Sequence, residues 1–158
     1  RFSSMTRDVA SEEEMLRAGE ALGRILDEGD VVALAGTLGA GKTLFVRGLA
    51  RGLGVPANAP VPSPSFTLVN EIHGGRLPLF HVDLYRIERD EELAHLGLDE
   101  LFDRGAIVAI EWFERFRRIL PTDYLEVQIE VVSETIRSLE VISHGPRSAA
   151  RLAIWRAP

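Results

Sequence analysis

One stretch limits the folds open to this chain more than any other. Residues 36–43 read Gly-Thr-Leu-Gly-Ala-Gly-Lys-Thr and fit the pattern G-x-x-x-x-G-K-[ST]. The apolar run Asp30–Ala35 before it is typical of a buried strand. After it, apolar residues recur near the helical period, at Leu44, Phe45, Leu49 and Leu53. The order of strand, loop and helix predicts a phosphate-binding loop in an α/β domain.

The residue types in this loop suit phosphate chemistry. Gly36, Gly39 and Gly41 allow the backbone to curve closely around phosphate oxygens and to point its N–H groups at them. We expect Lys42 to reach the β- and γ-phosphates and the Thr43 hydroxyl to bind Mg²⁺. Lys42 is also the only lysine in the sequence, since every other Lys or Arg position is arginine. A compact ammonium therefore stands where a phosphate would need it.

Length and charge narrow the function classes further. At 158 residues the chain is expected to form one domain with a sizeable core. A net charge of −6 argues against a protein that holds nucleic acid on a basic face of its own. There is no cysteine, which excludes disulfides and thiolate metal sites, and no apolar run is long enough to span a bilayer. We expect a soluble, cytoplasmic protein without a membrane partner.

Two acidic residues follow apolar strands and are candidates for the metal site. Leu77–Val82 is followed by Asp83, and the strongly apolar Ala106–Ile110 is followed by Glu111. Ligands of α/β sheets bind outside the carboxyl ends of strands, where Mg²⁺ needs a carboxylate directly or through water. The pattern leaves open which of the two acids contacts the metal and which positions or activates a water.

A proline-rich loop follows the predicted helix, with Pro56, Pro60, Pro62 and Pro64. Residues 65–69 then begin a strand. A hydroxyl in this position often senses the γ-phosphate and its metal in phosphate-loop hydrolases, so Thr67 or Ser65 is a candidate switch residue. The alternative is an ordinary threonine at a strand edge.

The remaining pattern completes a single domain. Ser11 to Glu14 form a capping-box signature for a helix that ends before Gly29, residues 71–76 suggest a hairpin turn, and residues 89–102 are acidic and helical. Residues 125–132 and 136–142 alternate as an antiparallel pair. We therefore predict a phosphate-loop NTPase domain over residues 11–143, with a mixed central sheet flanked by helices and antiparallel strands late in the chain. Residues 1–10 are expected to be an extension, and 144–158 a tail without predicted structure.

Several blocks of the sequence together resemble one family. They are the phosphate-loop segment 36–43, Ser-Pro-Ser-Phe-Thr-Leu-Val at 63–69, His-Val-Asp-Leu-Tyr-Arg at 81–86, Ile-Glu-Trp at 110–112 and Leu-Pro at 120–121. Their order and spacing resemble TsaE, the small bacterial ATPase needed to make threonylcarbamoyladenosine in tRNA. The resemblance extends from about Ser11 to Arg137.

The resemblance implies a role for each matching residue. Phosphates of ATP would lie in a cradle formed by Leu38, Gly39, Ala40, Gly41, Lys42 and Thr43. Thr43 and Glu111 would bind Mg²⁺, Asp83 would be the Walker B acid, and Thr67 the switch threonine. The residues that act in catalysis would be Lys42, Thr67, Asp83 and Glu111. Trp112 would lie beside the nucleotide, and the adenine between Glu12 and Thr135. Thr37 departs from the family, which usually has an acid there, and this is expected to affect hydrolysis more than binding.

The resemblance also implies a biological setting. The family suggests a weak, magnesium-dependent ATPase that acts on a complex of TsaD-like and TsaB-like proteins and supports repeated rounds of tRNA modification. The acidic charge fits this arrangement, because the partners would hold the tRNA. The implied reaction is phosphoryl transfer to water.

Three other functions remain possible on the pattern of residues. A small-molecule kinase would use Arg115, Arg117 and Arg118 as a phosphate lid. A GTPase-like switch would share the threonine after the phosphate loop, although the sequence has no Asn-Lys-x-Asp motif to read guanine. A nucleotide-dependent binding module would hydrolyse ATP only incidentally.

Overall fold

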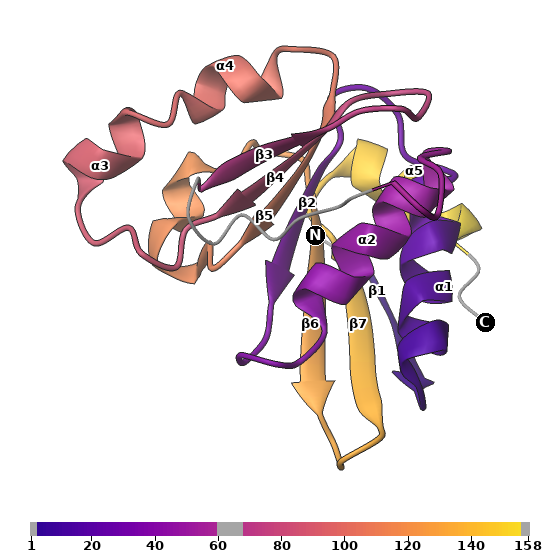
Figure 1. Ribbon diagram of the computed structural model, residues 1–158. Helices are drawn as coiled ribbons and strands as arrows, with labels where there is room; N and C mark the ends of the chain where they lie inside the picture. Colours follow the sequence, from indigo (N-terminus) through magenta and orange to yellow (C-terminus); the bar gives the residue numbers. More distant parts are fainter. Residues whose placement is uncertain (1–2, 60–67, 156–158) are drawn as a thin grey trace.

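The strand that leads into the phosphate loop lies at the centre of one mixed sheet. A computed structural model describes residues 3–59 and 68–155. In this part of the chain the strands are β1 (Ser4–Val9), β2 (Val31–Ala35), β3 (Val69–Ile72), β4 (Leu79–Asp83), β5 (Ile107–Glu111), β6 (Leu125–Val131) and β7 (Arg137–Ser143). Their order across the sheet is β1-β7-β6-β2-β5-β4-β3 (Figure 1).

The parallel part of the sheet is its middle. β2 is parallel to both β5 and β6, and β5 is parallel to β4. β3 pairs with β4, β7 with β6 and β1 with β7 in antiparallel fashion. The predicted α/β class, the mixed sheet and the late antiparallel pair are confirmed.

Helices cover both faces of this sheet and enclose two apolar clusters. The helices are α1 (Glu12–Gly23), α2 (Lys42–Gly52), α3 (Asp90–Ala94), α4 (Leu98–Phe102), α5 (Pro146–Ile154) and the 3₁₀ helix η1 (Glu114–Ile119). Residues of α1 and α2 pack on one face, around Leu34, Phe45 and Leu49. Residues of α3, α4 and η1 join the cluster on the other face, around Phe80 and Val108. β2 therefore carries alternate side chains into two cores, as a buried parallel strand does.

Helices α1 and α2 are in backbone contact, and this contact fixes the helix that follows the phosphate loop. Its glycines are Gly19 and Gly23 in α1 and Gly48 and Gly52 in α2. A Cβ atom on Gly48 would lie 2.4 Å from the carbonyl oxygen of Leu16, and one on Gly19 would lie 2.3 Å from that of Phe45. Because no side chain fits there, the helices approach this closely only with glycine at these positions.

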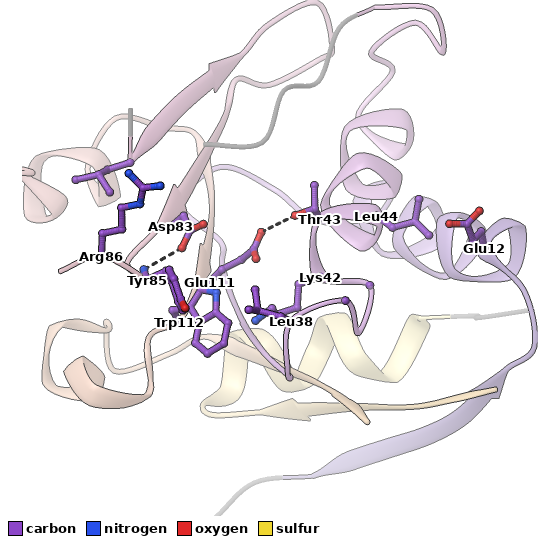
Figure 2. Close-up of a pocket in the computed structure, with 13 residues that line it drawn as sticks. Glu12, Leu38, Lys42, Thr43, Leu44, Asp83, Tyr85, Arg86, Glu111 and Trp112 are labelled. Carbon is purple, nitrogen blue, oxygen red and sulfur yellow. Dashed lines mark hydrogen bonds between the residues drawn. The ribbon is translucent and has the colours of Figure 1, made fainter. Parts of the chain in front are cut away.

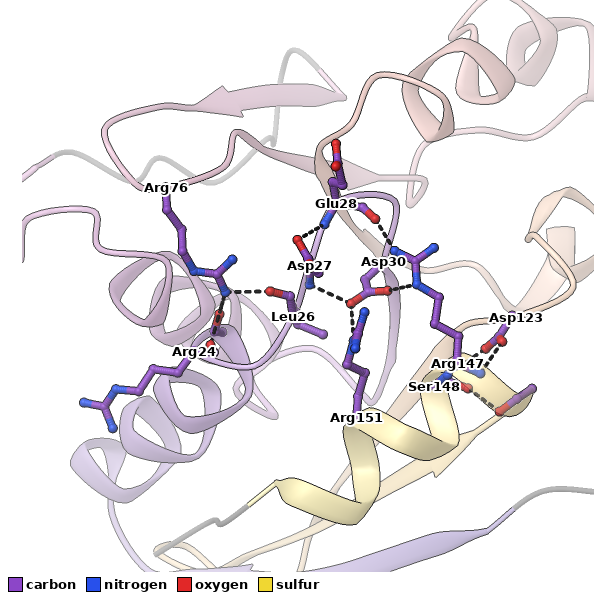
Figure 3. A network of polar contacts seen from close by, with 12 residues as sticks. Arg24, Leu26, Asp27, Glu28, Asp30, Arg76, Asp123, Arg147, Ser148 and Arg151 are labelled. Carbon is purple, nitrogen blue, oxygen red and sulfur yellow. Dashed lines mark hydrogen bonds and ion pairs between the residues drawn. The ribbon is translucent and has the colours of Figure 1, made fainter.

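Residues 146–154, for which no structure was predicted, form α5 and pack against the rest of the domain. The Asp123 carboxylate caps the start of α5 by accepting the backbone N–H groups of Arg147 at 2.7 Å and Ser148 at 2.9 Å (Figure 3). At the far end Trp155 is fully buried, and its Nε1 donates to the carbonyl oxygen of Ala18 in α1 at 3.2 Å. The N-cap residue, Gly145, makes no side-chain cap, and the capping carboxylate is distant in sequence.

Buried Asp30 ties α5 to the start of β2. Its Oδ1 lies 2.9 Å from Nε of Arg147, and its Oδ2 lies 2.8 Å from Nε of Arg151 (Figure 3). The backbone N–H of Asp27 also donates to Oδ2 at 2.8 Å. The carboxylate is thus fully engaged, as a buried charge must be.

Other expectations about local structure also change. Ser4–Val9 is edge strand β1 and not an extension; of its side chains only Val9 is buried, so the alternation that reveals a strand is weak. The expected helix over 89–102 is two short helices separated at Gly97, whose φ is +65°. The hairpin is present, but its first strand extends to Ile72. In the described part of the chain, no helix combines the length and apolar character needed to cross a membrane.

Replacing Gly48 with alanine tests the helix contact. The added Cβ would push α2 away from α1, and we expect the free energy of unfolding to fall by about 1–3 kcal/mol, as for other overpacked sites. Arg47→Ala is the control, because Arg47 is exposed on the same helix and its loss should change stability by no more than about 0.5 kcal/mol. Chemical denaturation measures both. Equal stability of the two variants would contradict the close contact.

Candidate functional site

The register of the parallel strands brings two acids and the phosphate loop to one edge of the sheet. Asp83, the last residue of β4, pairs with Glu111, the last residue of β5. Leu34 of β2 pairs with Glu111 on its other side, just before the loop begins. The carboxyl ends of parallel strands form the ligand site of open α/β sheets, so this edge is the candidate site.

A cavity of about 430 Å³ lies at this edge. Its lining consists of Glu12, Leu38, Gly39, Gly41, Lys42, Thr43, Leu44, Leu68, Asp83, Tyr85, Arg86, Glu111 and Trp112. In Figure 2 the two acids approach from the sheet while Lys42 and Thr43 approach from the phosphate loop and the start of α2. The cavity is large enough for a nucleotide's phosphates and sugar.

The phosphate loop is held in the shape that its glycines permit. A Cβ atom on Gly36 would lie 2.7 Å from the carbonyl oxygen of Ile129 in β6, so the loop leaves β2 in close contact with its neighbour. Gly39 has a φ of +79°, and a Cβ there would meet nothing within 4 Å. The loop is therefore packed at its base and open at its turn, where phosphate oxygens would lie.

Lys42 is the buried cation of the site. Only 5% of its surface is exposed, its Nζ donates to the carbonyl oxygen of Gly36 at 2.6 Å, and this Nζ lies 3.5 Å from the centroid of the Trp112 ring. Burial lowers the pKa of Lys42, although Glu111, Glu114 and Asp83 each raise it in part. Trp112 has a φ of +60°, a strained value for a residue with a side chain. The ring is thus held against the ammonium at some backbone cost.

Glu111 joins the phosphate loop to the sheet. The Thr43 hydroxyl donates to its Oε2 at 3.3 Å, and Nε2 of His81 donates to the same oxygen at 2.5 Å. A carboxylate only accepts, so both neighbours act as donors. Glu111 is 4% exposed, and this buried anion lies within hydrogen-bond reach of the hydroxyl that a phosphate loop uses for Mg²⁺.

Asp83 is the half-buried acid of the site. Burial raises the pKa of its carboxyl, and nearby Glu111 raises it further, while a hydrogen bond from the Tyr85 backbone N–H to Oδ1, 2.9 Å long, opposes the shift. The direction shows that the protein around Asp83 disfavours its charged form. A divalent cation between the two carboxylates would reverse this preference.

The donor set fits Mg²⁺ together with a nucleotide. No group of three or more His, Cys, Asp or Glu side chains within residues 3–59 and 68–155 could hold a metal by itself. Thr43, Glu111 and Asp83 offer too few oxygen atoms to surround Mg²⁺ by themselves. In such sites Mg²⁺ completes its coordination shell with water and phosphate oxygens. These residues would hold the ion only when a phosphate ligand is bound.

Most of the expected site residues line this cavity. Leu38, Gly39, Gly41, Lys42, Thr43, Asp83, Glu111, Trp112 and Glu12 line the cavity. Buried Ala40 lies inside the loop, and Thr135 lies in the turn between β6 and β7, outside the lining. Thr67 and Ser65 lie outside the described residues.

Among the residues of the site without an expected role are Tyr85, Arg86 and His81. Tyr85 and Arg86 line the cavity and His81 contacts Glu111, all from the block at 81–86 that served only as a family signature. A signal for His81 was present, because a histidine between Phe80 and Val82 interrupts the apolar run of this strand. Tyr85 packs on Trp112 with ring centroids 4.9 Å apart.

The arginine cluster that the alternative kinase hypothesis would use as a lid is bonded within its own chain. Arg115 donates to the carbonyl oxygen of Ile87, and Arg118 donates to Asp90. Arg117 donates from both terminal nitrogens to the Glu126 carboxylate, at 3.1 and 3.2 Å. Burial alone would raise the pKa of Glu126, but the bonds from Arg117, then Gln128 and His144, hold this pKa below its ordinary value.

Comparison with known proteins gives a consistent family. A family model described as "Threonylcarbamoyl adenosine biosynthesis protein TsaE" matches residues 9–139. The chain is 44% identical to a tRNA threonylcarbamoyladenosine biosynthesis protein TsaE from Nostoc sp., over 84% of this chain and 82% of that protein. It is 37% identical to the TsaE of Haemophilus influenzae, over 90% and 91% of the two chains.

A solved structure has the same fold. The crystal structure of YdiB from Bacillus subtilis superimposes with a TM-score of 0.81 and 29% identity, covering 97% of this chain and 94% of that one. The first and last elements, β1 and α5, therefore lie within the shared architecture.

Substituting Arg117 tests whether this arginine stabilises the fold or closes over a bound nucleotide. Arg117→Ala leaves buried Glu126 without its main donor, and we expect a loss of about 1–2 kcal/mol in unfolding free energy at neutral pH, with ATP affinity unchanged. The pKa of Glu126 is lowered in the folded protein. The loss of stability therefore has its full size at pH values above about 4.5, the ordinary pKa, and disappears as the pH falls through the folded pKa.

Arg118→Ala is the matched control for this experiment. Its partner Asp90 is exposed, so the substitution should change stability by at most about 0.5 kcal/mol. Urea denaturation at several pH values and ATP titration measure the two effects. A fall in ATP affinity in Arg117→Ala without a fall in stability would restore the lid hypothesis.

Proposed function

This chain belongs to the TsaE family of tRNA threonylcarbamoyladenosine biosynthesis, and we propose that it serves this modification as a magnesium-dependent ATPase. Its partners would be TsaD-like and TsaB-like proteins, which hold the tRNA. The net charge of −6 supports this arrangement, since tRNA binding by this chain alone would be opposed by its charge.

One observation carries the proposal. The hydroxyl of Thr43, at the start of α2, lies 3.3 Å from the carboxylate of Glu111, which is paired in register with Asp83. A phosphate loop and two acids thus meet in one cavity (Figure 2). This is the set of groups that phosphoryl transfer from a nucleotide requires.

The residues divide the work between binding and charge stabilisation. Backbone N–H groups of the phosphate loop would bind the α- and β-phosphates, and Lys42 would exchange its bond to Gly36 for one to the β- and γ-phosphates. Thr43 and Glu111 would hold Mg²⁺, which when bound neutralises charge on the phosphate oxygens. Asp83, facing the same space, would order the attacking water and accept its hydrogen bond.

Competing nucleotide chemistries have less support. A kinase needs cations that close over an acceptor, and Arg115, Arg117 and Arg118 are each bonded within the chain. A GTPase needs a guanine-reading motif, which the sequence lacks. Hydrolysis by water therefore accounts for the site with fewer additional groups.

Two substitutions test the nucleotide site. Lys42→Ala removes the phosphate cation, and ATP affinity should fall by about 10- to 100-fold, the worth of a hydrogen bond to a charged group. Thr43→Ala should weaken ATP binding only when Mg²⁺ is present, by about 10-fold. Thr43→Ser keeps the hydroxyl and is the control. Isothermal titration with and without Mg²⁺ measures these constants; equal loss in both conditions would remove Thr43 from the metal site.

Reconstitution tests the biological role. Threonylcarbamoyladenosine formation on tRNA by TsaD and TsaB homologues would be followed over many turnovers with this protein, without it, and with its Lys42→Ala variant. We expect modification beyond the first round to fall at least about 10-fold without a functional ATP site, with Arg47→Ala behaving as wild type. Modification that is indifferent to the protein would refute the role. ATP turnover that needs a small acceptor would instead indicate a kinase.

A further inference from the structure

His81 is a fully buried polar side chain within a strand of the central sheet. It is in the interior of β4, fully buried, between Phe80 and Val82. Alternate residues of a strand share a face, so His81 and Asp83 point to the same side of the sheet. Glu111 follows two residues after Ala109, the partner of His81 in β5, and lies on this face as well.

The histidine uses one ring nitrogen and leaves the other unpaired. Its Nε2 donates to Oε2 of Glu111 at 2.5 Å, whereas Nδ1 is buried and has no hydrogen-bond partner within the described chain. A buried polar atom without a partner costs on the order of 1–3 kcal/mol. An apolar residue would avoid this cost, so the packing of the core does not explain the histidine.

The bond it makes restricts the carboxylate of Glu111. The Thr43 hydroxyl and Nε2 of His81 donate to the same oxygen, Oε2, from the loop and from the sheet. No hydrogen bond to Oε1 is formed by the residues that the structure describes. The two donors thus fix the rotation of the carboxylate and leave its other oxygen available to a cation.

We propose that His81 is a positioning residue that orients Glu111 toward the Mg²⁺ of the bound nucleotide. Outer partners of metal ligands commonly set ligand orientation in this way. The inference rests on the proposed function, since it assumes that Glu111 binds the metal. It assigns His81 no contact with the nucleotide or the reacting atoms.

Replacing His81 by leucine and by glutamine tests the proposal. His81→Leu fills the apolar space but cannot donate, while His81→Gln retains an N–H donor at about the reach of Nε2. The readout is the factor by which Mg²⁺ strengthens ATP binding, from titrations with and without the metal. We expect this factor to fall about 10- to 100-fold in His81→Leu and to be largely retained in His81→Gln, with metal-free ATP affinity unchanged in both.

A second background shows whether His81 acts through Glu111. In Glu111→Gln the metal ligand is already lost, so adding His81→Leu should change the magnesium factor by less than about twofold. An equal loss in both backgrounds would overturn the proposal, as would a wild-type factor in His81→Leu. If Mg²⁺ does not change the ATP affinity of the wild-type protein, the metal site of the proposed function is overturned as well. If Mg²⁺ strengthens ATP binding in the wild-type protein and equally in His81→Leu, only the inference is overturned.

Discussion

The parallel register of β2, β5 and β4 is the constraint on which the rest of the structure depends. It places Leu34, Glu111 and Asp83 side by side where their strands end. A shift of one residue in β5 would turn Glu111 to the opposite face, away from Thr43, because side chains alternate along a strand. Ile110 would then face the phosphate loop, and the sheet would offer it no anion.

In the protein alone, two charged groups of this site lie in unfavourable surroundings. Burial lowers the pKa of Lys42 and raises that of Asp83, so the surroundings disfavour the charged form of both. A phosphate would compensate the ammonium and a divalent cation the carboxylates. Trp112, whose ring covers the ammonium of Lys42, has a strained backbone φ in this same arrangement. The protein therefore holds in place groups whose favourable partners are those of a magnesium nucleotide.

Sequence reasoning succeeded where a local pattern and a tertiary role coincide. The strand, loop and helix around Lys42 and the apolar run before Glu111 are read from periodicity, and their relative placement follows from the rules of parallel sheets. It failed where partners are distant in sequence. β1 forms by pairing with β7, and α5 is capped by Asp123. The partners that hold β1 and α5 cannot be identified from the residues next to these elements in the sequence.

Other features were visible but ambiguous. Gly19 with Gly23, and Gly48 with Gly52, repeat at a spacing of four residues, but glycine lowers helix propensity and only the facing helix explains it. His81 stood inside a recognised block without a stated task. In both cases the residue type is unfavourable for the helix or strand that contains it, and a contact with another element explains its presence.

The division between arginine and lysine follows from the same geometry. Arginines connect elements through carbonyl and carboxylate oxygens. Arg76 donates to the carbonyls of Gly23, the last residue of α1, and of Leu26 just after it, and Arg137 of β7 donates to that of Ala40 in the phosphate loop. A planar guanidinium suits such fixed, multiple bonds. The phosphate position instead needs a cation that exchanges one partner for another as nucleotide enters. An ammonium on a flexible stem meets this need, and the chain places its single lysine there.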